Sequence, residues 1–173
     1  YDEDREREFI ERAAASIETT CGARPQGWLS RYLHTPRTRR LLVESGYRYH
    51  MDWPADDQPI WMRTRAGPIL SIPYSIEVND SPAIVFRHET ARDFEAMMID
   101  QFDEMLALSR RYPLVYSAVL HPFVLGQPFR LRALRRALTH ILRHRDEIWL
   151  ATPGQIAAHV ESLPPGTVPG SAP

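Results

Sequence analysis

The stretch LVYSAVLHPFVLGQPF, residues 114–129, organises the interpretation of this chain. It opens with an apolar run rich in β-branched and aromatic side chains, which is short for a helix and typical of a buried strand. The run ends at His121, because Pro122 lacks the N–H that a central strand needs. Gly126 and Pro128 then turn the chain into an arginine-rich helix. Because α/β folds bind ligands at the carboxyl ends of strands, His121 is the first candidate functional residue; the alternative is a turn histidine that bonds only the backbone.

The composition excludes several classes of protein. The chain has 173 residues, 43% of them hydrophobic and 25% charged, which fits one packed domain or part of a larger one. The net charge of −1 gives no general reason to expect nucleic acid or an anionic membrane as a partner. All 21 basic residues are arginine, so no catalytic lysine exists, and Cys21 is the only cysteine, so no internal disulfide or cysteine zinc site can form. No signal peptide or 18-residue apolar run is visible, and we expect a cytoplasmic protein.

Hydrophobic periodicity and turn residues predict alternating strands and helices. Helices are expected over residues 2–20, 35–46, 90–106, 129–141 and 152–163, with Thr35, Thr90 and Thr152 as N-caps. Strands are expected within residues 22–29, 47–53, 60–63, 69–73, 114–120 and 147–151, with a hairpin turn at 66–68. Such alternation indicates an α/β fold with a mainly parallel sheet or barrel. Residues 164–173 are rich in proline and glycine, and we expect this tail to be disordered.

Two helices carry side chains that bear on packing or chemistry. The first is expected to bury Phe9, Ile10, Ala13, Ala14 and Ile17, and the fourth Phe129, Leu131, Leu134, Leu138 and Ile141.

His140 and His144 lie four residues apart on the fourth helix, which is a spacing that can hold a metal. No carboxylate motif accompanies them and arginines surround them, so the sequence favours a solvated face and predicts no metal site in this chain.

Several short motifs follow one another in a specific order. They are Gly22-x-Arg24-Pro25-x-Gly27-Trp28, Thr35-Pro36-x-Thr38-Arg39-Arg40-Leu41-Leu42, Tyr49-x-x-Asp52, Ile72-Pro73-Tyr74 with Asn79-Asp80, and Leu120-His121-Pro122. This set resembles the polysaccharide deacetylase (NodB-homology) superfamily and looks most like the branch of the metal-independent allantoinases. The resemblance implies that residues 1–163 are the C-terminal part of a polysaccharide deacetylase-like domain, followed by the Pro/Gly-rich tail 164–173. The implied fold is the C-terminal portion of a distorted (β/α)7 barrel, incomplete without an upstream half.

The resemblance also implies roles for individual residues. His121 matches the general acid that protonates the leaving nitrogen, Arg24 the arginine that orients a catalytic aspartate, and Asp52 a residue of the groove. The implied substrate-binding residues are Trp28, Trp53, Tyr74, Asn79 and Leu120. The chemistry is consistent with these roles, because a histidine titrates near neutrality, Asp52 could orient it through a hydrogen bond, and an arginine holds a carboxylate bidentately. The alternatives are a structural ion pair for Arg24, a loop cap for Asp52 and simple core packing for Trp53.

The implied activity is hydrolysis of non-peptide C–N bonds, either of a cyclic amide such as allantoin or of an N-acetyl sugar. The superfamily's Asp-Asp motif and its paired-histidine metal motif come before the matching residues, so we expect the chain to be part of a longer protein. A divalent metal could then be held through that upstream part, and none is expected from this chain. A non-catalytic binding protein with the same fold is the alternative. The expected partners are a small amide or N-acetyl sugar, with no nucleic acid or membrane, and a homo-oligomer is compatible with the sequence.

Overall fold

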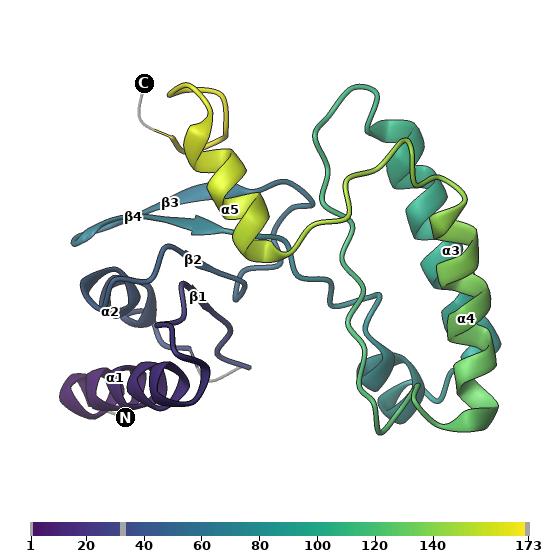
Figure 1. Ribbon diagram of the computed structural model, residues 1–173, viewed down its shortest axis with the longest axis horizontal. Helices are drawn as coiled ribbons and strands as arrows, with labels where there is room; N and C mark the ends of the chain where they lie inside the picture. Colours follow the sequence, from purple (N-terminus) through teal and green to yellow (C-terminus); the bar gives the residue numbers. More distant parts are fainter. Residues whose placement is uncertain (1, 32–33, 172–173) are drawn as a thin grey trace. The chain divides into compact units, whose positions relative to one another are not determined.

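The computed structural model describes residues 2–31 and 34–171 (Figure 1). The chain divides into two compact units. Unit 1 consists of Tyr1–Trp53, Pro59–Ile72 and Ala151–Pro173, and unit 2 of Pro54–Gln58 and Pro73–Leu150. Among the described residues, no helix combines the length and the apolar character that crossing a membrane requires.

Unit 1 contains a four-stranded sheet in the order β1-β2-β4-β3. Its strands are β1 (Gly27–Trp28), β2 (Tyr49–His50), β3 (Ile60–Thr64) and β4 (Gly67–Ser71). β1 and β4 pair with β2 in parallel, whereas β3 and β4 form an antiparallel hairpin in which Thr64 lies opposite Gly67. The hairpin and the mainly α/β character were predicted, and the sheet is open in the part of the chain that the structure describes.

Three helices complete unit 1: α1 (Glu3–Cys21), α2 (Thr38–Glu44) and α5 (Pro153–Ser162). α1 begins at the N-cap Asp2 and ends at Gly22, whose left-handed φ of 75° favours glycine. Its buried side chains, Ile10 and Ala14, pack with side chains of α2 and β4, and α5 packs on Leu70 and Ile72. The predicted capping box of α5 is present, with Thr152 and Gln155 each accepting a backbone N–H of the other.

Some predictions for unit 1 were wrong. Phe9 and Ile17 of α1 are exposed, because only the narrower stripe with Ile10 and Ala14 faces the core. α2 begins at Thr38 rather than at Thr35, and Arg37 occupies the N-cap position. The Thr35 hydroxyl donates to the buried carboxylate of Glu6 and accepts from the N–H of Arg37.

The tail also differs from the predicted disorder in its described residues. The N–H of Trp61 donates to the carbonyl of Pro169 at 2.8 Å, and Val168 packs against the cluster of Leu70 and Ile72. The described part of the tail therefore lies against β3. Gly170 comes so close to Trp61 that an added Cβ would lie 2.0 Å from its carbonyl oxygen.

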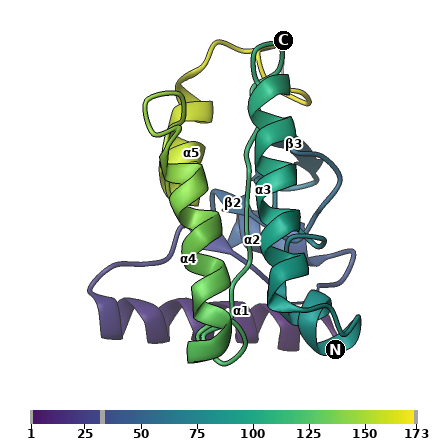
Figure 2. The same ribbon diagram turned by 90° about the vertical axis from the view of Figure 1, so that its right-hand side faces the viewer.

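Unit 2 is built on two packed helices, α3 (Ala91–Leu108) and α4 (Pro128–Leu142), which lie side by side (Figure 2). A short π-helical segment, η1 (Ser81–Phe86), precedes α3, which starts with the predicted capping box of Thr90 and Asp93. α3 buries Phe94, Met98, Phe102 and Met105, and α4 buries Ala133, Ala137 and Ile141. Phe129 and Leu138 of α4, predicted to be buried, are exposed, because the small alanines form the packed stripe.

Two predicted strands of unit 2 did not form as strands. Residues 114–120 run extended along the core of α3 and α4 but make a single parallel bridge, between Asn79 and Val119. Their other partners are irregular: the N–H of Val115 donates to the carbonyl of Asp57, and the Ser117 hydroxyl accepts from the N–H of Ser75. Residues 147–151 have no strand partner among the described residues; in the chain they precede α5.

Candidate active site

The centre of the candidate site is a hydrogen-bonded pair, Asp80 and His121, formed by two segments of unit 2 that are 41 residues apart. The Asn79–Val119 bridge aligns the two segments, and the N–H of Asp80 donates to the carbonyl of Val119 at 3.1 Å. The side chain of Asp80 then accepts two hydrogen bonds. Oδ2 accepts from the backbone N–H of His121 at 2.8 Å, and Oδ1 lies 2.6 Å from its Nδ1. The carboxylate thus fixes both the backbone and the ring of His121.

The two side chains differ in their access to solvent. Asp80 has an exposed fraction of 0%, whereas the side chain of His121 is 27% exposed. Since an ionised carboxylate can only accept, Nδ1 of His121 carries the hydrogen of this contact. Nε2 has no hydrogen-bond partner within residues 2–31 and 34–171. The pair therefore presents one ring nitrogen of fixed direction to an incoming molecule, which is the arrangement that general acid–base chemistry needs.

Backbone hydrogen bonds and buried side chains fix the loop that follows His121. The carbonyl of His121 accepts from the N–H groups of Val124 and Leu125, and both of these side chains are buried in the core of unit 2. Gly126 is required for this turn, because a Cβ there would lie 2.2 Å from the carbonyl oxygen of Pro122. Phe123 stays 66% exposed and meets the edge of the His121 ring, with 5.2 Å between ring centroids.

The extended stretch that leads to His121 is anchored along α3. Tyr116 donates its hydroxyl to the carbonyl of Met98 at 3.1 Å and packs edge-on against Phe102. Burial raises the pKa of Tyr116, so its hydroxyl stays protonated and remains a donor at neutral pH.

Asp52 lies in unit 1, and its hydrogen-bond partner is Ser30. Its Oδ1 accepts from the backbone N–H of Ser30 at 2.6 Å and its Oδ2 from the Ser30 hydroxyl at 2.7 Å. The Ser30 hydroxyl in turn accepts from the indole N–H of Trp28. The carboxylate that orients His121 is therefore Asp80; the sequence had suggested Asp52 for that task, because the spatial pairing of Asp80 with His121 was not visible in it.

A buried histidine adjoins Asp52. The N–H of Asp52 donates to Nδ1 of His50 at 3.2 Å, and Nε2 of His50 is buried without a partner in the described part of the chain. Burial lowers the pKa of His50 to about 4, because desolvation penalises the imidazolium more than the charge of Asp52 supports it. His50 is therefore neutral at physiological pH.

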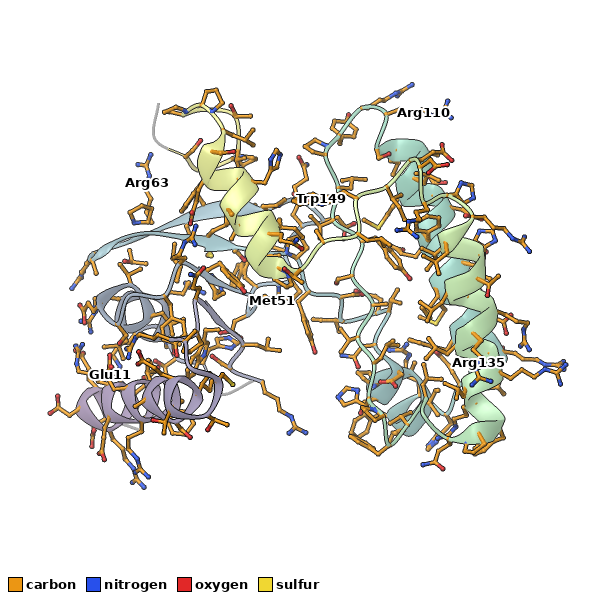
Figure 3. The ribbon with its side chains drawn as sticks, in the orientation of Figure 1. Glu11, Met51, Arg63, Arg110, Arg135 and Trp149 are labelled. Carbon is orange, nitrogen blue, oxygen red and sulfur yellow. The ribbon has the colours of Figure 1, made fainter. Side chains whose placement is uncertain are left out.

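Arg24 makes contacts with α1. Its guanidinium lies 2.7 Å from a carboxylate oxygen of Glu11 and 3.9 Å from one of Glu18, and it donates to the carbonyl of Ser45. Figure 3 labels Glu11 on α1. Among the described residues, the carboxylates that Arg24 contacts are these two, and both pairs are partly exposed.

Comparison with solved structures relates this geometry to known proteins. Puue Allantoinase matches with a TM-score of 0.86 and 32% identity, over 94% of this chain and 54% of its own. A polysaccharide deacetylase-type protein of Pseudomonas aeruginosa PAO1 matches with a TM-score of 0.83 and 32% identity, over 91% of this chain and 53% of its own. A polysaccharide deacetylase-type protein of Mycobacterium smegmatis matches with a TM-score of 0.79 and 25% identity, over 99% of this chain and 60% of its own. This chain has the fold of one part of a polysaccharide deacetylase domain.

The chain spans between 53% and 60% of the length of these three solved chains, so the match covers a part of the polysaccharide deacetylase fold. The resemblance that the ordered motifs indicated is thereby confirmed. No protein-family profile and no curated protein matches the chain.

The other predicted site residues of this deacetylase-like chain are placed as follows. In unit 2, Tyr74 is half-buried, Leu120 is 38% exposed, and Asn79 is buried with its Oδ1 accepting from the N–H of Ser81. In unit 1, Trp28 is half-buried against Phe9 and Tyr47. Trp53 is 44% exposed and lies beneath the guanidinium of Arg39, 5.4 Å from the ring centroid.

The structure thus brings Asn79, Leu120 and His121 into one unit and places Arg24, Trp28, Asp52 and Trp53 in the other. The residue that sequence reasoning missed is Asp80, which it quoted in a motif without giving it a role. A signal was present, because an acidic residue that ends an extended segment and directly precedes a short helix stands where strand-end ligands occur. Its partner 41 residues away could be found only in the structure.

Proposed function

We propose that this protein hydrolyses non-peptide C–N bonds, with His121 as the general acid and Asp80 as the residue that positions it. The observation that carries the proposal is the Asp80–His121 pair, with 2.6 Å between Oδ1 and Nδ1 and a buried carboxylate behind a partly exposed ring. The deacetylase-like fold supports the same reaction class.

The proposed step balances as follows. Water adds to the amide carbonyl, the C–N bond breaks, and the proton on Nε2 of the His121 imidazolium goes to the departing nitrogen. The products are a carboxylic acid and an amine. Asp80 holds Nδ1–H throughout, so Nε2 is the nitrogen that gives up its proton. The group that activates the water belongs, by the resemblance, to the superfamily motif that precedes the matching residues.

The substrate class is either a cyclic amide such as allantoin or an N-acetyl sugar. By the resemblance, the segment with Ile72-Pro73-Tyr74 and Asn79-Asp80 favours the cyclic amide. The roles of Arg24 and Asp52 stay predictions of the resemblance. A binding protein that kept the fold without turnover is the competing proposal.

The experiment compares the intact wild-type protein with His121→Ala on allantoin and on N-acetylated chitooligosaccharides. His121→Ala should lower kcat by roughly 10²–10⁴, the usual contribution of a general acid. The basic limb of the pH–rate profile should disappear, because that limb reports loss of the acid's proton. The melting temperature should fall as well, because His121→Ala leaves one oxygen of the buried Asp80 carboxylate without its side-chain partner, so kcat is compared at a temperature at which circular dichroism shows both proteins to be folded.

The matched control is His88→Ala, which removes an exposed histidine of the same unit and should leave kcat unchanged. Wild-type turnover by His121→Ala would refute the proposed mechanism. A wild-type protein that binds one of these compounds in calorimetry but hydrolyses neither would support the competing binding function.

A further inference from the structure

A second group of titratable side chains lies on α3 and α4 and shares no residue with the Asp80–His121 pair. Asp103 comes from α3, His140 from the last turn of α4, and His144 from the turn that follows α4. The three residues each offer one ligand atom, and these atoms all lie within 4.8 Å of one another. The carboxylate that the sequence did not show beside the two histidines is therefore supplied by the neighbouring helix.

Hydrogen bonds already orient the two imidazole rings. Nε2 of His140 lies 2.7 Å from Oδ1 of Asp103, and Nδ1 of His144 lies 2.8 Å from Oε1 of Glu147. The bond to Glu147 leaves Nε2 of His144 as the available ligand atom. A carboxylate on the far nitrogen of a ligating imidazole is a frequent feature of metal sites, because it fixes the ring and raises its basicity.

The rings also have a rigid support. Phe102 is buried and contacts both imidazoles, with ring centroids 6.3 Å from His140 and 5.7 Å from His144. The centroids of the two imidazole rings are 5.8 Å apart. Both histidines are partly exposed, so an ion can reach them from solvent.

We propose that Asp103, His140 and His144 form a zinc-binding site that links α3 to α4. Imidazole nitrogen and carboxylate oxygen are ligands that zinc accepts, at about 2.0–2.2 Å, with water completing a tetrahedral shell. Such a shell needs ligand atoms about 3.4 Å apart. Small rotations of the three side chains close the present distances, and the direct contact of His140 with Asp103 gives way to their shared bonds to the ion.

Two arginines of α4 oppose a cation less than the sequence suggested. The guanidinium of Arg136 forms a two-bond pair with Glu95 of α3, which compensates its charge. Arg135 is exposed and projects outward from α4 (Figure 3). Two acidic residues, Asp103 and Glu147, lie in contact with the histidines.

The experiment titrates the metal-free intact protein with ZnCl₂ in a calorimeter and follows thermal unfolding in parallel. The expected stoichiometry is one zinc per chain at this site. Asp103→Asn, His140→Gln and His144→Gln should each weaken binding at least about 10-fold. At a free zinc concentration about 100 times Kd, the melting temperature should rise by roughly 5–10 °C, the shift expected for a chain of this length, and EDTA should reverse it.

Glu104→Gln and His88→Gln are matched controls, because they remove an exposed acidic residue next to Asp103 and an exposed histidine elsewhere in unit 2. Both should bind zinc as the wild type does. Zinc affinity that survives all three cluster variants, or is lost in His121→Ala instead, would overturn the proposal. Loss in the two histidine variants with full affinity in Asp103→Asn would overturn the link between the helices. Far-ultraviolet circular dichroism identifies any variant that fails to fold. If one does, the Co²⁺ absorption spectrum of the wild-type protein tests for the site instead, and intense d–d bands of a tetrahedral Co²⁺ ion are expected.

Discussion

Asp80 and Asp52 are two aspartates in similar local settings that the fold uses differently. Each follows a short extended segment, and each accepts a backbone N–H and a side-chain hydrogen through its two oxygens. The side-chain partner of Asp52 is the hydroxyl of Ser30, which does not titrate in the physiological range, whereas that of Asp80 is His121. The comparison teaches that the partner, rather than the carboxylate or its position in the sequence, separates a structural aspartate from a candidate functional one.

The largest expected difference concerns catalysis. Asp80→Asn should lower kcat by roughly 10²-fold or more, because an amide facing Nδ1 can favour the wrong tautomer of His121. The imidazole ¹⁵N shifts of His121 should report the change of tautomer, which a purely structural role would not produce. Asp52→Asn is the matched variant and should leave these shifts as they are. Unchanged shifts and unchanged kcat in Asp80→Asn would remove the distinction between the two aspartates.

The next effect is a pH dependence of the free energy of unfolding, caused by His50, the neighbour of Asp52. Because the pKa of His50 is lowered to about 4 in the folded protein from 6.5, the unfolded chain binds more protons between these values. The contribution of neutral His50 to the free energy of unfolding is therefore fully present above pH 6.5 and is lost as the pH falls towards 4. The total loss should be roughly 3 kcal/mol.

Urea unfolding of unit 1 at a series of pH values measures this loss. His50→Gln should flatten the dependence in that range, and His88→Gln, which alters an exposed histidine, should not. Equal slopes in the wild type and in His50→Gln would show that His50 is not held neutral by the fold.

The third effect is the structural role of Asp52 itself. Asp52→Ala leaves the N–H and hydroxyl of Ser30 without their acceptor, so the free energy of unfolding should fall by about 1–3 kcal/mol. The change is read from the urea midpoint of unit 1. Asp52→Asn should cost less, because an amide oxygen still accepts one of the two bonds. A loss of turnover in Asp52→Ala without loss of stability would instead favour the role that the resemblance implies.

The smallest effect is expected at Arg24. Its ion pairs with Glu11 and Glu18 are exposed to solvent, and such pairs contribute little to stability because water and salt screen them. Arg24→Lys should therefore shift the melting temperature very little. If the intact protein uses Arg24 to orient a catalytic carboxylate, the same variant should lower kcat, since a point charge cannot replace the planar guanidinium. Unchanged turnover would leave Arg24 with its contacts to α1 alone.

The sequence by itself determined the local features of this protein. The capping boxes of α3 and α5, the end of α1 at Gly22 and the hairpin of β3 and β4 depend on residues only a few positions apart. Their hydrogen bonds close within one turn, so a reader of the sequence can complete them. The ordered motifs likewise predicted the polysaccharide deacetylase fold, and they placed His121 after an extended stretch.

Only the tertiary structure decided which groups meet. Asp80 pairs with His121 across 41 residues, and His140 with Asp103 across 37, and no local pattern encodes either contact. The packed stripe of α4 consists of Ala133, Ala137 and Ile141 rather than of its larger side chains, because the close approach of α3 and α4 selects small residues. Residues 114–120 have strand-like composition, yet they make one bridge because strand formation requires a neighbour, and the described chain offers them mostly loops.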